Sequence, residues 1–302
     1  MITLLQLDYF RKLAATEHIT RTAKELYISQ TALSSMIIGL EKELGVQLFD
    51  RSKRAIHLND AGRLYLNYVN EAFNALENGR AALNDLTESV ERHVGIAMGT
   101  SQIWRPMLRD FSRAYPECTI KQYNLDLDGL SQSLEEMTVD FVIAGTADIP
   151  DGEMECVPIK NDHVYLCVPR NHRLAGRESV HLKELEGEAF INLNVGTPWE
   201  RYCSQLFREA GVNVRTVVEC DYTVRASLVE SEFGVALTSA SAYEVDLLKP
   251  NCYVPIADEF ARRELALFWN PKKYMSRAAC HFRDFCIDYW KTHDRLPPED
   301  GE

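Results

Sequence analysis

The sequence predicts a multidomain protein that combines an all-α amino-terminal part with a larger α/β part. Two observations lead to this fold class. Apolar residues recur at helical spacing through about residue 87, and from about residue 92 short apolar runs of strand length alternate with helical stretches. The length agrees with this prediction, because 302 residues with 46% hydrophobic content can bury the cores of two or three domains.

The charge of the chain changes sign along its length. Residues 1–58 hold eight Lys and Arg against six Asp and Glu, a net charge of +2. The whole chain has a net charge of -12, so the remaining residues carry -14. Only the amino-terminal segment therefore suits a polyanion such as nucleic acid.

Two helices are expected at the start of the chain. The segment LLQLDYFRKLAAT, residues 4–16, places apolar side chains on one face at helical spacing. A short helix follows, with Thr20 as its expected N-cap and with Ala23 and Leu26 turned inward. The next expected helix begins about three residues after Leu26, which is the brevity of a helix-turn-helix.

This third helix has an apolar side and a polar side. Leu33, Ile37, Leu40 and Leu44 recur at helical spacing and form a stripe that belongs to a core. The other side presents short hydroxyl and amide groups, which can contact base edges and phosphates in a major groove. The candidate DNA-binding residues on it are Ser29, which is also the expected N-cap, Gln30, Thr31, Ser34 and Ser35. An ordinary solvated helix surface is the alternative interpretation.

Residues 20–62, TRTAKELYISQTALSSMIIGLEKELGVQLFDRSKRAIHLNDAG, resemble the DNA-binding head of the LysR-type transcriptional regulators. The matching positions are Ala23, Leu26, Ser29, Gln30, Ser34, Ile37, Leu40, Glu41, Leu44, Gly45, Leu48, Phe49, Arg51, Ala61 and Gly62. The resemblance implies a winged helix-turn-helix domain over residues 1–58 that binds a double-stranded DNA operator. It also implies a wing after Phe49 whose Arg51, Lys53 and Arg54 contact phosphates.

The head departs from the family pattern at a few positions. The family usually has Pro at the position of Thr31, and it often has basic residues where this chain has Ser35, Ile38 and Gly39. One or two of the family's phosphate or base contacts are therefore expected to be absent, and an operator sequence cannot be carried over.

A long helix is expected from Asn59 to about Thr87, capped by Asn59 or Asp60, with Gly79 as a candidate bend. Its apolar stripe is formed by Tyr65, Tyr68, Val69, Ala72, Leu76, Leu83 and Leu86. The resemblance implies that residues 59–89 form a linker and dimerisation helix in a homodimer or homotetramer. It also admits RNA polymerase as a partner. A helix packed on its own chain is the alternative.

Residues 90–302 more loosely resemble the family's effector-binding domain, which is similar to periplasmic solute-binding proteins. Strands are expected at 94–99, 119–125, 140–145, 163–169, 189–194, 234–239 and 265–269, in largely parallel sheets. The resemblance implies two lobes with a hinge of two crossings: lobe I holds residues 90–161 and 265–302, and lobe II holds residues 162–264.

Open parallel sheets bind ligands beyond the carboxyl ends of their strands, and the resemblance points to the same positions. The candidate effector-binding residues are Thr100, Ser101, Gln102, Gly145, Thr146, Asn192, Asn194, Thr197, Trp199, Tyr222, Thr223 and Thr238. A helix expected to start near Gln102 would offer backbone N–H groups to an anion, so the predicted effector is a small carboxylate. Helix capping alone is the alternative for Thr100 and Ser101.

The sequence shows no pattern typical of catalysis, metal binding or disulfide formation. It contains no GxSxG, Walker or HExxH motif, so no catalytic residue is expected and an enzyme with a helical head is disfavoured. Neither Cys280-His281 with Cys286 nor His163 with Cys167 has a common zinc spacing, so neither a metal nor a cofactor is expected. The eight cysteines contain no CxxC pair and are predicted to be reduced thiols.

The chain shows neither a signal peptide nor an apolar run of about twenty residues, so we expect a cytoplasmic protein without a membrane partner. Together these features predict a transcriptional regulator that binds DNA and responds to a small molecule between its two lobes. The alternatives are a solute-binding protein, which the carboxyl-terminal part alone would fit, and a redox-responsive regulator that uses its cysteines.

Overall fold

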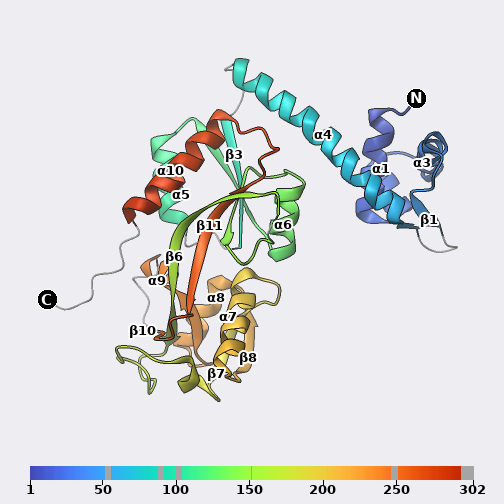
Figure 1. The fold of residues 1–302 in the computed structure, drawn as a ribbon. Coiled ribbons are helices and arrows are strands. Elements are labelled where there is room, and N and C mark those ends of the chain that lie inside the picture. Colours follow the sequence, from blue (N-terminus) through green and yellow to red (C-terminus); the bar gives the residue numbers. More distant parts are fainter. Residues whose placement is uncertain (52–55, 88–91, 100–103, 151, 246–250, 294–302) are drawn as a thin grey trace. The chain divides into compact units, whose positions relative to one another are not determined.

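The structure is a computed structural model that describes residues 1–51, 56–87, 92–99, 104–150, 152–245 and 251–293 (Figure 1). The chain divides into two units, Met1–Ala81 and Ala82–Glu302. Helix α4 (Asp60–Thr87) begins in the first unit and ends in the second. No helix in the described ranges is long and apolar enough to cross a membrane.

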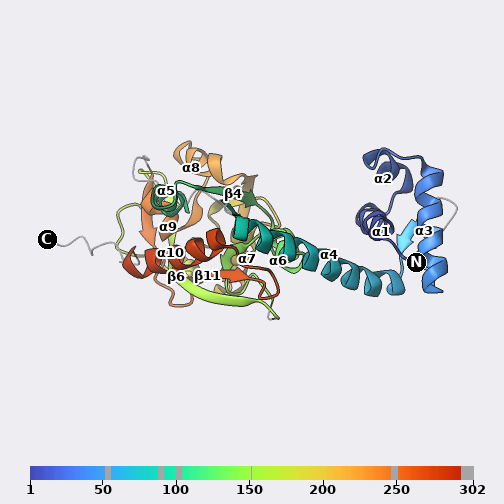
Figure 2. The ribbon, with the colours of Figure 1, turned by 90° about the horizontal axis from the view of Figure 1, so that it is seen from above.

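Three helices form the head: α1 (Leu4–Thr16), α2 (Ile19–Glu25) and α3 (Gln30–Leu44) (Figure 2). Their apolar faces meet in one core, as the helical spacing in the sequence predicts. The fully or nearly fully buried members of this core are Phe10, Leu13, Ala23, Leu33, Ile37, Leu40, Leu48, Phe49, Ile56 and Val69.

Side chains cap the helices of the head. The Ser29 hydroxyl accepts a hydrogen bond from the Ala32 N–H at 3.1 Å, which confirms Ser29 as the N-cap of α3. The prediction of Thr20 as the N-cap of α2 is wrong. His18 holds that position, and its Nδ1 accepts from the Arg21 N–H at 3.3 Å. A histidine cap does not belong to the Ser, Thr, Asp and Asn set that the sequence analysis searched for.

A two-stranded antiparallel hairpin follows α3, with β1 (Phe49–Arg51) paired to β2 (Ile56–Leu58). The chain then turns into α4, where the Asn59 side chain accepts from the Gly62 N–H at 2.9 Å and acts as the expected cap. A Cβ at Gly62 would lie 2.2 Å from the Leu48 carbonyl oxygen, so only glycine permits this close approach.

The apolar side chains of helix α4 lie in two different environments. Near the start of the helix, Val69 is 2% exposed and packs with Tyr65 and Phe73 in the core of the head. Other large apolar side chains of the helix remain more than half exposed, at Leu64, Tyr68, Leu76, Leu83 and Leu86. The predicted stripe therefore contains both buried and exposed residues, and only the exposed set, here called the α4 stripe, is open to a partner.

The second unit is built on a seven-stranded mixed sheet with the order β10-β6-β11-β5-β3-β4, in which β9 also pairs with β6. The strands are β3 (Arg92–Met98), β4 (Cys118–Asn124), β5 (Phe141–Gly145), β6 (Glu155–Val168), β9 (Ala236–Ser239), β10 (Cys252–Pro255) and β11 (Arg262–Trp269). Strand β3 is parallel to β4 and β5, whereas β11 is antiparallel to β5 and β6. The expectation of largely parallel sheets is therefore wrong for this sheet.

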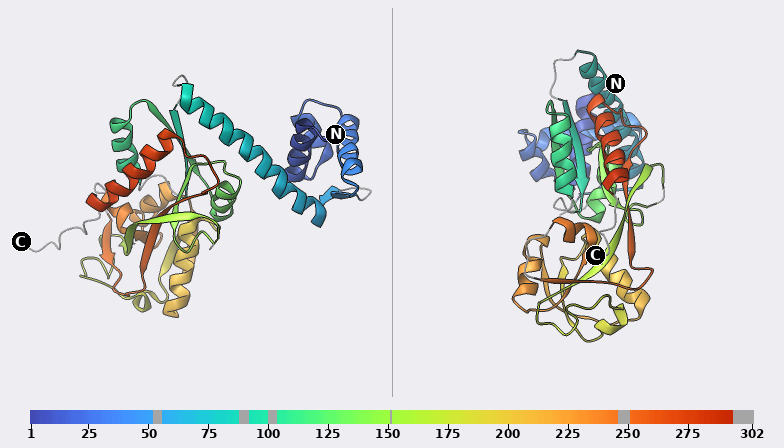
Figure 3. Two further views of the ribbon diagram at one scale, coloured as in Figure 1. Left: turned by 45° about the horizontal axis from the view of Figure 1, so that its top comes forward. Right: turned by 90° about the vertical axis from the view of Figure 1, so that its left-hand side faces the viewer.

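Two lobes are arranged along this sheet, and β6 and β11 run from one lobe to the other (Figures 1 and 3). Lobe I carries the helices α5 (Arg105–Ala114), α6 (Leu127–Glu135) and α10 (Arg277–His293). Lobe II carries a parallel pair, β7 (Ala189–Leu193) and β8 (Arg215–Cys220), with a 3-10 helix (Leu182–Leu185), α7 (Pro198–Ala210), α8 (Tyr222–Glu230) and α9 (Ala240–Val245).

Strands β6 and β11 pair with each other around the predicted boundary between the lobes. Arg263 of β11 pairs with Asp162 of β6, and Leu265 pairs with Lys160, before a register shift between Leu265 and Ala266. The lobe bounds at 161/162 and 264/265 stay a prediction. Seven expected strands are present, whereas β8 and β10 were not predicted.

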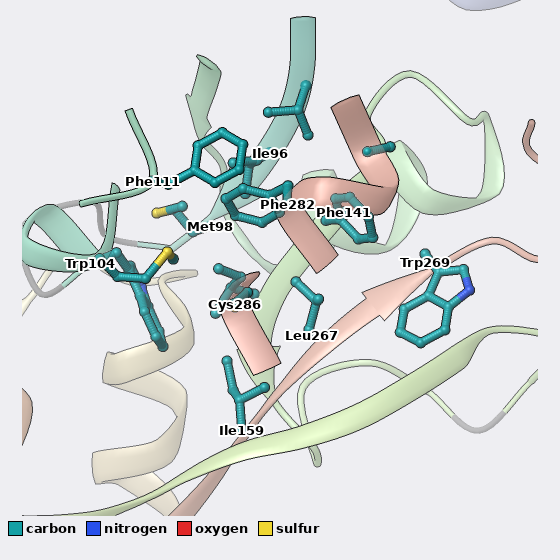
Figure 4. Packing of buried hydrophobic residues seen from close by; sticks show 14 of the residues in the cluster. Ile96, Met98, Trp104, Phe111, Phe141, Ile159, Leu267, Trp269, Phe282 and Cys286 are labelled. Carbon is teal, nitrogen blue, oxygen red and sulfur yellow. The ribbon is translucent and has the colours of Figure 1, made fainter. Parts of the chain in front are cut away.

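Aromatic side chains fill the core of lobe I between the sheet and α10 (Figure 4). Phe111 of α5 and Phe282 of α10 pack edge to face with ring centroids 5.1 Å apart. Trp104 packs in the same way on Trp290 of α10, at 5.4 Å. These contacts join α10 to α5 and to Trp104, the residue before α5.

Candidate functional sites: the face of helix α3 and the cleft between the lobes

The polar side of α3 is solvent-exposed along its first turn and a half. Gln30, Thr31 and Ser35 are exposed and Ser34 is partly exposed, while the apolar stripe of the same helix is buried. The hydroxyl of Ser29 caps the helix and also lies 2.9 Å from the Thr31 hydroxyl. The first turn is therefore rigid, and its short polar groups form one exposed surface.

The turn before α3 adds an aromatic residue that the sequence analysis missed. Tyr27 is 96% exposed and has a φ of 55°, in the left-handed region that non-glycine residues rarely adopt. Its backbone is held by the tight turn, since the Ile28 N–H donates to the Ala23 carbonyl at 3.0 Å. A large side chain held outward by a strained turn is typical of a functional surface.

The hairpin is held to the helices by a carboxylate. Glu17 ends α1 with a φ of 47°, and its side chain accepts from the Leu58 N–H at 2.7 Å and contacts His57 Nδ1 at 2.9 Å. The hydrogen bond from Leu58, followed by that of His57, lowers the pKa of Glu17. Strand β1 includes the predicted contact residue Arg51, whereas Lys53 and Arg54 lie outside the described residues.

In the second unit, a pocket of about 580 Å³, a volume that includes space open to solvent, lies between the lobes. Its lining comes from both lobes and from the hinge strands: Gly99, Trp104, Ile143, Ala144, Asp162, Leu193, Thr197, Pro198, Trp199, Tyr222, Arg225, Ser239, Arg263 and Leu265. Most of these side chains are apolar or aromatic, and a few are charged. This composition is typical of a small-molecule site.

Three of the predicted effector-binding residues line this pocket. Thr197 caps α7 by accepting from the Glu200 N–H at 3.3 Å, and the Trp199 indole donates to the Leu237 carbonyl at 3.2 Å. Tyr222 lies at the first turn of α8 with its ring facing the Arg225 guanidinium at 5.0 Å. Thr238, a fourth predicted residue, accepts from Arg225 next to the pocket.

The other predicted residues that the structure describes do not line the pocket. Asn192 donates to the Thr216 hydroxyl, Asn194 donates to Asp221, and Thr223 is exposed. Gly145 is the last residue of β5, and Thr146 follows it. Thr100, Ser101 and Gln102, with the expected helix start near Gln102, lie outside the described residues; helix α5 begins at Arg105.

Arg225 is the most unusual group of the pocket, and the sequence analysis missed it. Its residue is 6% exposed, and its guanidinium donates to the Leu237 carbonyl and the Thr238 hydroxyl, each at 3.0 Å. Within the part of the chain that the structure describes, no carboxylate pairs with it. A buried cation without a counter-ion is costly, so the pocket favours an anion next to Arg225.

Arg263, also missed, contributes a second guanidinium that already has a partner. It forms a salt bridge with Asp148, whose carboxylate also accepts from the Gly145 N–H at 2.8 Å. A Cβ at Gly145 would lie 2.7 Å from Arg263 Nε, so glycine leaves the room that this side chain needs. The Trp199 ring lies 5.9 Å from the guanidinium.

Asp162 is a buried carboxyl group on the hinge side of the pocket. It is 2% exposed and accepts from the Ser241 N–H at 3.0 Å and the Ser241 hydroxyl at 3.1 Å. Burial raises its pKa, while the hydrogen bonds and the charge of Lys160 act in the opposite direction. Asp162 thus connects the pocket to the start of α9.

Two of the buried cysteine thiols, Cys203 and Cys286, do not have the environment of reactive groups. Burial raises the pKa of Cys203 and of Cys286 to about 12, so the thiolate form is disfavoured at neutral pH. His281 lies near Cys118 and Glu117, close enough for the three to be considered as metal ligands. Cys118 is itself buried with a raised pKa, and Glu117 lies 3.6 Å from Arg92.

The chain matches two family models and many known proteins. Residues 4–63 match "Bacterial regulatory helix-turn-helix protein, lysR family", and residues 88–291 match "LysR substrate binding domain". The uncharacterized HTH-type transcriptional regulator YybE of Bacillus subtilis (strain 168) is 26% identical over 297 residues, covering 94% of this chain and 98% of that protein.

Two further similarities extend over nearly the whole chain. A probable RuBisCO transcriptional regulator of Synechocystis sp. is 28% identical over 309 residues, covering 98% of this chain and 89% of that protein. The solved structure of a full-length OxyR variant from Pseudomonas aeruginosa has a TM-score of 0.72 at 20% identity and covers 99% of each chain. At that identity the structure supports the fold alone.

The two matched segments correspond to the two sites. The first contains the helix-turn-helix with its exposed α3 face, and the second contains both lobes with their pocket and spans more than half of the chain. Regulators of this kind bind DNA and small-molecule effectors, form oligomers and are not enzymes. The chain therefore belongs to the LysR family of transcriptional regulators, as a DNA-binding protein with a substrate-binding domain.

Proposed function

We propose that this regulator is controlled by a small organic anion that binds between its lobes with Arg225 as counter-ion. The observation that carries this proposal is the buried guanidinium on the pocket lining, which lacks a carboxylate partner among the described residues. The neighbouring rings of Trp199 and Tyr222 suit the body of an aromatic or short aliphatic carboxylate.

The anion favours one arrangement of the lobes because it contacts both of them. Arg225 and Tyr222 belong to lobe II, while Trp104 and Ile143 belong to lobe I. Any effector that contacts both sides binds the closed arrangement more tightly than the open one, and that difference in affinity shifts the population of the two. If the two arrangements also differ in DNA affinity, the effector changes DNA affinity by a coupling free energy, and DNA changes effector affinity by the same amount.

A thermal-shift series tests the anion site. Full-length protein is heated with benzoate or butyrate and, in parallel, with benzamide or butyramide, which have similar shapes but no charge. A ligand at one hundred times its Kd stabilises the folded protein by about 2.7 kcal/mol. We expect acids and not amides to raise the melting temperature, and we expect Arg225→Gln to lower the affinity by at least about tenfold.

Two further variants control this experiment. Arg225→Lys keeps the charge and should retain part of the shift, which separates loss of the anion contact from damage to lobe II. Arg262→Gln removes an exposed cation on strand β11 and should change nothing. Equal stabilisation by amides, or an unchanged shift in Arg225→Gln, would place the effector elsewhere.

The proposed DNA contacts of the head are of two kinds, contacts that read sequence and contacts that supply charge. Gln30, Thr31, Ser34 and Ser35 contact base edges or nearby phosphates, while Arg51 supplies charge. Replacing Gln30 with Ala should weaken binding to a selected duplex much more than binding to random DNA. Arg51→Ala should weaken both and lower the log–log salt slope by about 0.9, the value for one lost phosphate contact. An unchanged slope would remove Arg51 from the interface.

The α4 stripe supports self-association, and a homodimer or a homotetramer is the proposed assembly. Contact with RNA polymerase stays a prediction from the family resemblance. A redox-responsive regulator is disfavoured, because the pKa values of the buried thiols Cys203 and Cys286 are raised. A solute-binding protein is disfavoured by the helix-turn-helix head.

A further inference from the structure

The last turn of the linker helix is bonded to the start of α10. Asp85 lies in that turn, and one of its carboxylate oxygens accepts from the Arg277 N–H at 2.9 Å and from the Tyr274 hydroxyl at 3.2 Å. Arg277 is the first residue of α10, so its N–H has no partner within the helix. A carboxylate at this end also interacts favourably with the helix dipole.

Asp85 completes a cap that α10 only partly supplies itself. The Ser276 hydroxyl accepts from the Ala279 N–H at 3.2 Å, and Asp85 accepts from the N–H two residues earlier. The acceptor for the first N–H thus comes from a different helix, about 190 residues away in sequence. This contact fixes the position of the end of α4 on lobe I.

Helix α10 also reaches the effector pocket. One core cluster contains its buried residues together with three residues that line the pocket, Trp104, Ile143 and Leu265. The most direct contact is between Trp104 and Trp290, whose rings pack edge to face at 5.4 Å. The Lys160 ammonium of the hinge lies 4.7 Å from the Trp290 ring. A rigid helix therefore connects the pocket lining at one end with Asp85 at the other.

We propose that Asp85 is the positioning residue that joins the linker helix to α10, so that the effector domain and the DNA-binding head respond to each other. Asp85 touches neither DNA nor effector. It acts by holding the last turn of α4 against a helix that packs on the pocket lining. Without it, each part keeps its own ligand, but binding at one no longer changes the other.

Hydrogen exchange of the full-length protein tests the contact first. In Asp85→Ala the Arg277 N–H loses its acceptor, so peptides over residues 274–280 and 82–87 should exchange about tenfold faster, the factor for one hydrogen bond to a charged group. Asp85→Asn keeps an oxygen that can accept both bonds and should restore most of the protection. Glu77→Ala removes an exposed carboxylate from the same helix and should exchange like the unmodified protein.

Duplex DNA then tests the coupling, and no effector is needed because linkage is reciprocal. The probe is a duplex that the protein selects from a random-sequence library. In the unmodified protein, in Asp85→Asn and in Glu77→Ala, saturating duplex should change the exchange of peptides from α10. In Asp85→Ala the duplex should bind within about threefold of the unmodified affinity, while the change in α10 disappears.

Each other result overturns the proposal. Unchanged exchange at 274–280 in Asp85→Ala means that the contact does not fix the two helices. Coupling does not pass through Asp85 if the duplex leaves the exchange of α10 peptides unchanged in the unmodified protein. The same conclusion follows if the duplex changes this exchange equally in Asp85→Ala and in the unmodified protein. Because these measurements use no small molecule, their failure is distinct from a failure of the proposed anion site.

Discussion

The buried and the exposed apolar side chains of α4 allow one helix to be tested for two roles. Leu76 is 52% exposed on the α4 stripe, and replacing it with Ala removes three carbons without lowering helix propensity. At about 0.8 kcal/mol per buried carbon, complete burial of these atoms contributes about 2.4 kcal/mol, and the exposed half leaves about 1.2 kcal/mol for a partner to bury. A symmetric dimer contains this contact twice, so Leu76→Ala should weaken dimerisation by about 2.4 kcal/mol, or roughly sixtyfold in Kd.

Val69→Ala is the matched control, seven residues earlier in the same helix. Val69 is 2% exposed in the core of the head, so the loss of two carbons and the resulting cavity should lower the free energy of unfolding by about 2 kcal/mol. Its dimer Kd should stay unchanged. A charge at Val69 would disrupt the core of the head and so would not test the dimer contact.

Sedimentation of the full-length protein over a range of concentrations measures the Kd, and urea unfolding measures the stability. The assignment requires that the two variants separate: Leu76→Ala changes the Kd alone, and Val69→Ala changes the stability alone. If Leu76→Ala dimerises with the unmodified Kd, the stripe is not the dimer contact and the solvent-exposed apolar side chains need another explanation.

Three further predictions concern the head and the thiols. Gly62→Ala should destabilise the head by about 1–3 kcal/mol, because its methyl group would overlap the Leu48 carbonyl, whereas Gly79→Ala, with open space around it, should stabilise α4 by about 0.8 kcal/mol in urea unfolding. The lowered pKa of Glu17 means that its bond to the hairpin is complete at neutral pH and is lost as the pH falls below 4.5 through that lowered value. The protection of β2 amides against hydrogen exchange, relative to their intrinsic rates, should therefore fall at acidic pH, but not in Glu17→Gln. Cys203 should resist iodoacetamide at pH 8 in the folded protein, and its modification there would revive the redox alternative.

The sequence predicts the head in most of its details because local patterns determine it. Apolar spacing defines α1 and α3, Ser29 marks a helix start, and the short turn defines the helix-turn-helix. The exception is the start of α2, where the Nδ1 of His18 accepts the capping hydrogen bond that a hydroxyl or carboxylate usually accepts. Nothing in a single sequence shows which tautomer a histidine adopts or whether its ring turns back toward the helix.

The pocket is less predictable because its groups meet only in three dimensions. The rule of strand ends selects residues by their place in the chain, and it found Thr197, Trp199 and Tyr222. It also selected Asn192, which points to a neighbouring strand. Arg225 carried a signal that was overlooked, since it lies four residues before the buried Val229 and hence on the apolar face of α8.

The order of strands in lobe I also has a consequence for synthesis of the chain. Strand β11 lies between β5 and β6 in the sheet, and α10, which covers the same core, follows it. The interior strand of this lobe is therefore the last one to leave the ribosome, more than 100 residues after its partner β5. Lobe II can begin to fold before lobe I, because lobe I still lacks its interior strand β11. A chain that ends at about residue 260 would hold most of the residues and yet lack β11, the strand that lies between β5 and β6 in the sheet.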